Sequence, residues 1–166
     1  MPVVTFERLP DDARVWVFGA AAPVDEIDAP KLLAAVDAFL LQWNAHGHPL
    51  TAARDWREDR FLIVGVDQRA EGASGCSIDG LFQTLKELES AIGTTLLAGG
   101  GVYFRDSIGL VHCITRQEFE AMSRRLQVNG DTPVFDTTVT TAGALRTHLE
   151  RPASTSWHAG LLQTAS

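Results

Sequence analysis

The sequence predicts an α+β fold: a split βαββαβ core, ferredoxin-like, extended by a C-terminal strand and two helices. Two segments, near residues 28–43 and 76–92, carry apolar residues at helical spacing. Between and around them lie short runs of alternating or continuous apolar residues that are typical of strands. The order of these segments along the chain is what favours the split core.

The first strand and helix are predicted near the N-terminus. Residues 14–20 (RVWVFGA) alternate large apolar side chains and end in small ones, as a strand does. Asp28 is expected to cap a helix that carries Pro30 in its first turn and stops near Gly47. Its apolar stripe recurs every three or four residues: Leu32, Leu33, Val36, Phe39, Leu40 and Trp43.

Two strands and a second helix follow. Residues 51–56 and 60–66 are expected to pair across the charged turn 57–59, with FLIVGV as the more buried strand. The second helix is expected to end at Gly93. Its predicted inward face comprises Ile78, Phe82, Leu85, Leu88 and Ile92.

The C-terminal part is expected to add a hairpin, two helices and a late strand. The hairpin comprises 102–104 and 110–114, and the capping box of residues 115–118 opens a helix that ends at Asn129-Gly130. A strand near 134–139 and a helix near 141–150 complete the predicted single domain, residues 1–152. Residues 153–166 form a tail that we expect to dock through Trp157 on the domain or on a second subunit, because an exposed tail need not carry tryptophan.

Composition narrows the class of protein. A formal charge of −7 and a pI near 5.1 argue against nucleic-acid and anionic-membrane partners. Two cysteines make a disulfide framework unlikely for a chain of this size, and the first residues do not resemble a secretory signal, so we expect a cytoplasmic protein. No nucleotide-binding glycine loop is present.

Connectivity places a candidate site at one edge of the predicted sheet. If the first strand runs upward, three features meet at the lower end of the sheet: the end of the first helix, the end of the third strand and the start of the second helix. The polar residues brought there are His46, His48, Asp67, Cys76 and Asp79.

Cys76 is the candidate nucleophile because the loop 72–75 delivers it to a helix N-terminus, where backbone N–H groups and the helix dipole stabilise a thiolate or a bound anion. His46 or His48 would act as base, and the Ser77 and Ile78 amides would hold developing negative charge. The alternative is a structural cysteine in a tight turn, and Asp79 in the same turn would raise rather than lower the pKa of the thiol.

Other chemistries are less well supported by the sequence. His46, His48, Asp67 and Cys76 carry atoms that bind zinc or iron, but no CxxC or HExxH spacing is present, so no cofactor is predicted and a metal is a minor alternative. Cys113 is predicted to be a core residue, with His112 on the opposite face of its strand.

Three segments resemble a family of small uncharacterised bacterial proteins: WNAHGHPL at 43–50, GASGCSID at 72–79 and SWH at 156–158. The resemblance extends to LPDDARVW at 9–16 and so covers nearly the whole chain. It implies that the matching positions are His46, Pro49, Leu50, Cys76, Asp79, Trp157 and His158, whereas His48 departs from the family pattern. Members are sometimes labelled ABC transporter ATPase, a label that this chain does not support because it has no Walker A lysine loop.

Two hypotheses follow. The first is a small-molecule or anion site centred on Cys76, His46 and Asp79. This site would be thiol-dependent and would act on a small anionic or electrophilic molecule. Its further binding residues would be Ser74, Gly75, Ser77, Asp67, Trp157 and His158. The second is a noncatalytic module that uses the Trp157 tail and the acidic surface for a protein partner or a homodimer.

Overall fold

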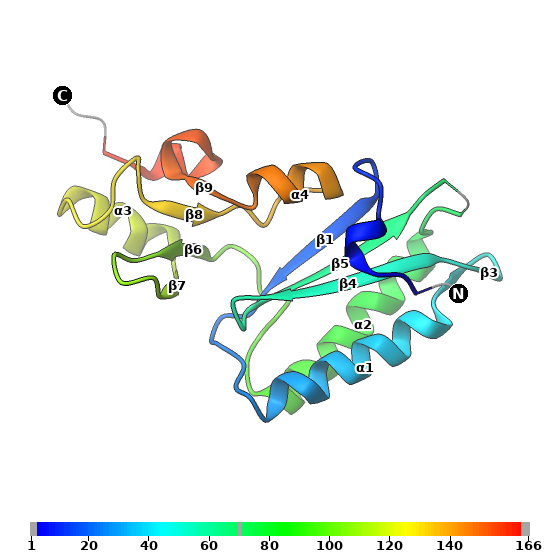
Figure 1. The fold of residues 1–166 in the computed structure, drawn as a ribbon. Coiled ribbons are helices and arrows are strands. Elements are labelled where there is room, and N and C mark those ends of the chain that lie inside the picture. Colours follow the sequence, from blue (N-terminus) through cyan, green and yellow to red (C-terminus); the bar gives the residue numbers. More distant parts are fainter. Residues whose placement is uncertain (1–2, 70, 164–166) are drawn as a thin grey trace.

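The computed structural model describes residues 3–69 and 71–163, which form an α+β fold with antiparallel sheets (Figure 1). The N-terminal part follows the predicted order of elements closely. After a short 3-10 helix (Phe6–Arg8) come β1 (Arg14–Gly19), α1 (Asp28–Gln42), the short strands β2 (Asn44–Ala45) and β3 (His48–Pro49), β4 (Thr51–Arg57), β5 (Phe61–Asp67) and α2 (Gly75–Ile92).

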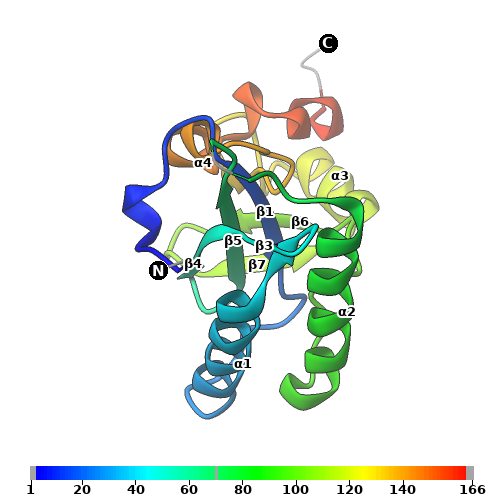
Figure 2. The same ribbon diagram turned by 90° about the vertical axis from the view of Figure 1, so that its right-hand side faces the viewer.

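β1, β5 and β4 form a three-stranded sheet in that order, with β5 in the middle. Arg14 of β1 lies opposite Val66, and Thr51 of β4 lies opposite Asp67. Both helices cover one face of this sheet, α1 toward β4 and α2 toward β1 (Figure 2). β5 is covered on both faces, which explains why FLIVGV is a continuous apolar run rather than an alternating one.

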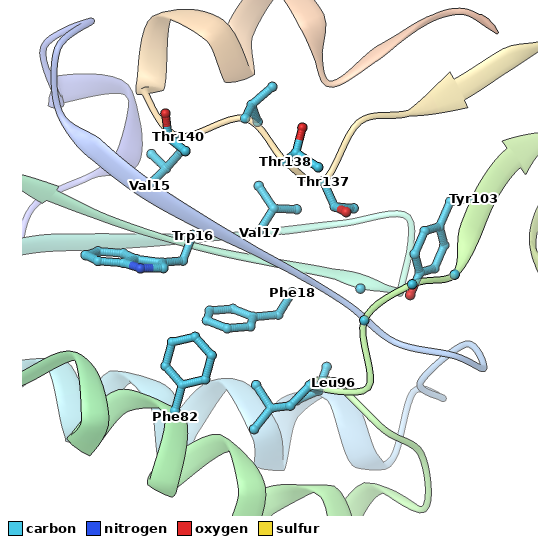
Figure 3. Close-up of a pocket in the computed structure, with 16 residues that line it drawn as sticks. Val15, Trp16, Val17, Phe18, Phe82, Leu96, Tyr103, Thr137, Thr138 and Thr140 are labelled. Atoms are coloured by element: carbon cyan, nitrogen blue, oxygen red, sulfur yellow. The ribbon is translucent and has the colours of Figure 1, made fainter. Parts of the chain in front are cut away.

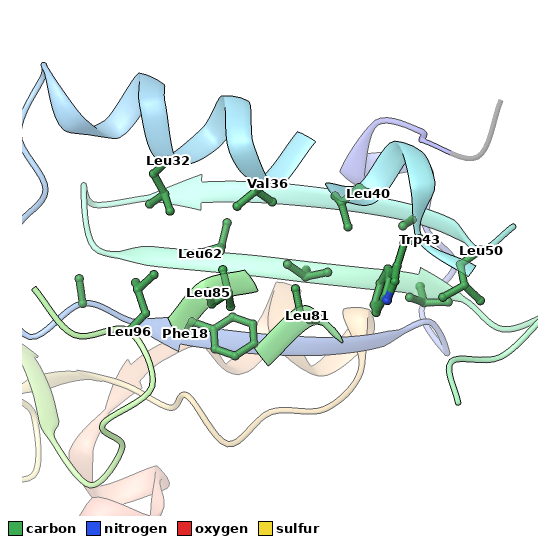
Figure 4. Packing of buried hydrophobic residues seen from close by; sticks show 14 of the residues in the cluster. Phe18, Leu32, Val36, Leu40, Trp43, Leu50, Leu62, Leu81, Leu85 and Leu96 are labelled. Carbon is green, nitrogen blue, oxygen red and sulfur yellow. The ribbon is translucent and has the colours of Figure 1, made fainter. Parts of the chain in front are cut away.

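The core between this sheet and its helices is mostly aliphatic, with Phe18 among the aliphatic side chains and Trp43 at one end (Figure 4). Leu32, Val36 and Leu40 of α1 are buried, as the predicted stripe requires. On α2 the buried face is centred on Leu81 and Leu85 rather than on Phe82, which is 39% exposed.

The ends of the helices differ in part from the prediction. The side chain of Asp25, not Asp28, accepts the backbone N–H groups of Ile27 and Asp28 at the start of α1. α1 ends at Gln42, before Gly47, because the chain turns into β2. Gly93 ends α2 with a φ of 71°, as predicted for a left-handed helix terminus.

The C-terminal part comprises β6 (Val102–Arg105), β7 (Val111–Ile114), α3 (Arg116–Arg124), β8 (Pro133–Phe135), α4 (Ala142–His148), β9 (Glu150–Pro152) and two 3-10 helices (Ala153–Thr155 and Trp157–Leu161). Its strands form a second sheet with the order β7-β6-β8-β9. α3 begins after Thr115, whose hydroxyl accepts the Glu118 N–H, so one of the two hydrogen bonds of the predicted capping box is present. α3 ends at Arg124, before Asn129.

The expected four-stranded ferredoxin-like sheet does not form, because β6 pairs with β7 and β8 instead of β1. A Cβ at Gly19 would come within 2.5 Å of the Tyr103 ring, so β6 packs its side chain onto the face of β1. Thr140 meanwhile accepts the Val15 N–H at the outer edge of β1. The position expected for the fourth strand is therefore bypassed.

The two sheets share a buried aromatic contact. Phe61 of β5 lies 5.0 Å from Tyr103 and 4.7 Å from Phe135, measured between ring centroids. At the surface, Arg105 pairs with Glu58 at 2.6 Å and with Glu150 at 2.7 Å. None of the helices in the described ranges is both long enough and apolar enough to cross a membrane.

Candidate functional site

The structure brings His46 and Cys76 to the walls of one pocket of about 340 Å³. His46 comes from the turn between β2 and β3, where it and Gly47 have φ values of 52° and 80°. Two consecutive left-handed residues are the geometry of a tight hairpin turn, and histidine adopts it more readily than most side chains. Cys76 comes from the first turn of α2 and is exposed. The pocket is lined by Phe39, Gln42, Trp43, Asn44, His46, Ser74, Cys76, Ser77 and Gly80.

The first turn of α2 is held by a reciprocal capping box. The Ser74 hydroxyl accepts the Ser77 N–H at 3.1 Å, and the Ser77 hydroxyl accepts the Ser74 N–H at 2.7 Å. The Ile78 N–H donates to the Ser74 carbonyl at 3.0 Å. The expected role of the Ser77 and Ile78 amides in holding negative charge is therefore wrong, because both amides already have acceptors.

Two other amides of this turn, those of Gly75 and Cys76, form no hydrogen bond within the part of the chain that the structure describes. Gly75 and Cys76 are the first residues of α2, and N–H groups at these positions have no carbonyl one turn earlier in the helix to bond. An anion at this end would meet them and the positive end of the helix dipole.

Trp43 connects the end of α1 to this turn. Its indole N–H donates to the Ser77 carbonyl at 2.7 Å in a buried hydrogen bond. Phe39 packs beside it, with ring centroids 5.6 Å apart. The walls of the pocket thus combine the aromatic rings of Phe39 and Trp43 with polar groups of His46, Ser74 and Cys76.

Three residues predicted to converge here lie outside the pocket walls. His48 is exposed on β3, and Asp79 is exposed one turn into α2. Asp67 forms an ion pair with Arg69 at 2.7 Å, and the hydrogen bonds from Arg69 lower the pKa of this carboxyl. Connectivity correctly predicted which ends of elements meet, but not which side chains face the space between them.

Trp157 and His158 lie in the 3-10 helix Trp157–Leu161 and do not line the Cys76 pocket. Trp157 packs against the core that includes Phe104 and Phe119, and His158 is fully buried beside it. Arg116 of α3 lies over the Trp157 ring at 4.9 Å. Since the tail docks on its own chain, a role for it in binding a second subunit stays a prediction.

A second cavity, of about 510 Å³, was missed by the sequence reasoning. Its wall holds His112, whose Nε2 lies 2.7 Å from Asp106 Oδ2, while the ring stacks on Phe104 at 5.1 Å. Asp106 also accepts the backbone N–H groups of Ile108 and Leu110, and its pKa is lowered, chiefly by the His112 contact. Those bonds hold the β6–β7 turn, which accounts for the pair without a ligand. The sequence pattern that could have indicated this pair is an aspartate in the hairpin turn, Asp106, six residues before the strand residue His112.

Within residues 3–69 and 71–163, no three His, Cys, Asp or Glu side chains gather closely enough to hold a metal ion. His46 and Cys76 thus share a pocket without a third ligand of those types. No protein-family model, curated protein sequence or solved structure matches this chain. Its function has to be inferred from the geometry of the site.

Proposed function

We propose that the protein binds a small anionic or electrophilic molecule at the pocket between the β2–β3 turn and the start of α2, with Cys76 as the reacting group. The observation that carries the proposal is that His46 and Cys76, 30 positions apart in the sequence, line the same pocket. His46 offers an imidazole nitrogen that can act as a base, and Cys76 offers an exposed thiol at a helix N-terminus.

The chemistry supported by these residues is addition of the thiol to an electrophile. His46 would accept the thiol proton, and the thiolate sulfur would form a bond to an electrophilic carbon. The two electrons displaced from that carbon would go to an adjacent oxygen or carbon, which would finally take the proton from His46. The Gly75 and Cys76 amides would favour negative charge beside them. Asp79 has no part in this scheme because it does not line the pocket.

The test is the rate at which iodoacetamide alkylates Cys76 as a function of pH. A Cys113→Ala background leaves one thiol in the chain. His46→Asn is the informative variant, since asparagine also tolerates the left-handed backbone of this turn, and His48→Asn is its matched control outside the pocket. We expect alkylation of Cys76 in the folded protein at neutral pH to be slowed by His46→Asn and unchanged by His48→Asn.

Two results would refute thiol chemistry at this site. One is alkylation of Cys76 only when the protein is unfolded. The other is an alkylation rate that is the same at every pH with and without the His46 imidazole.

A further inference from the structure

The outer edge of β1 borders a groove of about 280 Å³ that the proposed function does not use (Figure 3). This edge is where a fourth strand would have paired. The chain itself occupies both ends of it: the Val15 N–H donates to the Thr140 carbonyl at 2.9 Å, and the Ala21 N–H donates to the Thr95 carbonyl at 3.2 Å.

Val17 and Gly19 lie between these two bonds with their peptide groups directed outward. The Ala20 N–H donates to the carbonyl of Arg60, the residue before β5. The backbone groups of even-numbered residues of β1 therefore bond toward β5. Residues of an antiparallel strand bond alternately to one side and the other, so the N–H and C=O groups of Val17 and Gly19 face the groove. Among the described residues, none forms a hydrogen bond with these groups.

The helix side of the groove is apolar. Phe18, Phe82 and Leu96 gather below β1, and the Phe18 and Phe82 rings meet edge to face at 5.4 Å (Figure 3). α2 extends past β1, which leaves Phe82 39% exposed where a fourth strand would have covered it. Thr137, Thr138 and Thr140 form the other side.

The lining of the groove contains no Asp, Glu, Lys, Arg or His. A charged ligand would lose its hydration there without gaining an opposite charge, which is costly. The volume lies near the lower limit of small-molecule sites, about 300 Å³, and the chain closes both ends of the edge, so a long strand does not fit.

We propose that this groove binds a small uncharged molecule that carries a secondary amide and one apolar group. The amide completes the hydrogen bonds of Val17 and Gly19 in the manner of strand addition, and the apolar group contacts Phe82 and Leu96. The site is separate from the Cys76 pocket, with which it shares no lining residue.

The probe is N-acetyl-L-leucine N-methylamide, titrated into the ¹⁵N-labelled protein while backbone amide resonances are followed. We expect saturable shifts at the Val17 and Gly19 amides. Two matched ligands test the chemistry: the analogue methylated on the leucine nitrogen lacks a donor, and N-acetyl-L-leucine carries a charge. Each is expected to bind about tenfold more weakly or worse.

Variants test the location. Val17→Pro removes the outward N–H but no bond to β5, and Phe82→Ala removes the apolar contact; each should weaken binding about tenfold. Ile108→Ala, at an exposed apolar residue outside the groove, should leave binding unchanged. If Val17→Pro fails to fold, Phe82→Ala alone decides. The proposal is overturned if the Val17 and Gly19 amides show no saturable shift, or if all three ligands bind equally.

Discussion

Protonation of His158 should destabilise the protein as the pH falls below neutrality. The imidazole is fully buried and stacks on Trp157 with ring centroids 3.9 Å apart. Its Nδ1 lies 2.8 Å from the Ser156 hydroxyl, and its Nε2 has no hydrogen-bond partner among the described residues. A charged imidazole in this place would lack water around it.

Burial lowers the pKa of His158 from 6.5 to about 4. Asp136 opposes the shift, while Arg151 and Arg116 add to it. The unfolded chain therefore binds more protons than the folded one between these two pKa values. Stability is unaffected by this group above pH 6.5 and is lost as the pH falls, by about 2 kcal/mol at pH 5 and about 3 kcal/mol below pH 4.

The assay is urea unfolding from pH 7.5 to about 4.5 for the wild type and for His158→Phe, which keeps an aromatic ring but cannot titrate. The variant loses the contact with Ser156, so its stability at neutral pH is expected to fall by about 1 kcal/mol. The difference between the two proteins should then shrink and reverse sign as the pH falls.

The lowered pKa values of Asp67, Glu89 and Asp106 stabilise the folded protein above the ordinary carboxyl range, and this stabilisation is lost as the pH falls through that range. These contributions are common to both proteins. They cancel in the difference. Parallel stability profiles for the wild type and His158→Phe between pH 6.5 and 4.5 would refute the reasoning, because they would mean that His158 is solvated or already charged in the folded state.

Three further substitutions test the packing around the two sites. Gly19→Ala should destabilise the protein by about 1–3 kcal/mol, because the added Cβ would lie 2.5 Å from the Tyr103 ring. Gly75→Ala, whose Cβ would have no atom within 4 Å, should be neutral or stabilising. Equal unfolding midpoints of the two variants in urea would contradict this. Trp43→Phe removes the 2.7 Å hydrogen bond to the Ser77 carbonyl and should lower the free energy of unfolding by about 1 kcal/mol. It should also speed hydrogen exchange in the first turn of α2. Unchanged exchange would show that the bond does not hold this turn.

Local sequence patterns identified the elements of the first sheet with little error. β1 begins at Arg14 and α2 ends before Gly93, both as predicted. These features depend on neighbours within a turn or a strand, such as the left-handed position at Gly93. The C-terminal part was less predictable: β9 went unnoticed because three residues, Glu150–Pro152, are too few to show a period.

The candidate site was predicted in part. The meeting of the β2–β3 turn with the start of α2 followed from connectivity, which is why His46 and Cys76 were correctly grouped. Asp67 was grouped with them wrongly, because it forms an ion pair with Arg69, only two residues away, and does not line the pocket.

The sequence by itself determined an α+β fold, two amphipathic helices over a buried central strand, and the convergence of His46 and Cys76. Only the tertiary structure decided that β6 leaves the first sheet, that the open edge of β1 borders a groove, and that His158 is buried without a partner for Nε2. The physical reason is the separation along the sequence of the residues that interact. Periodicity and capping are interactions between near neighbours, whereas the pairing of a strand depends on contacts such as Tyr103 on Gly19 and Thr140 on Val15, which join residues more than 80 positions apart.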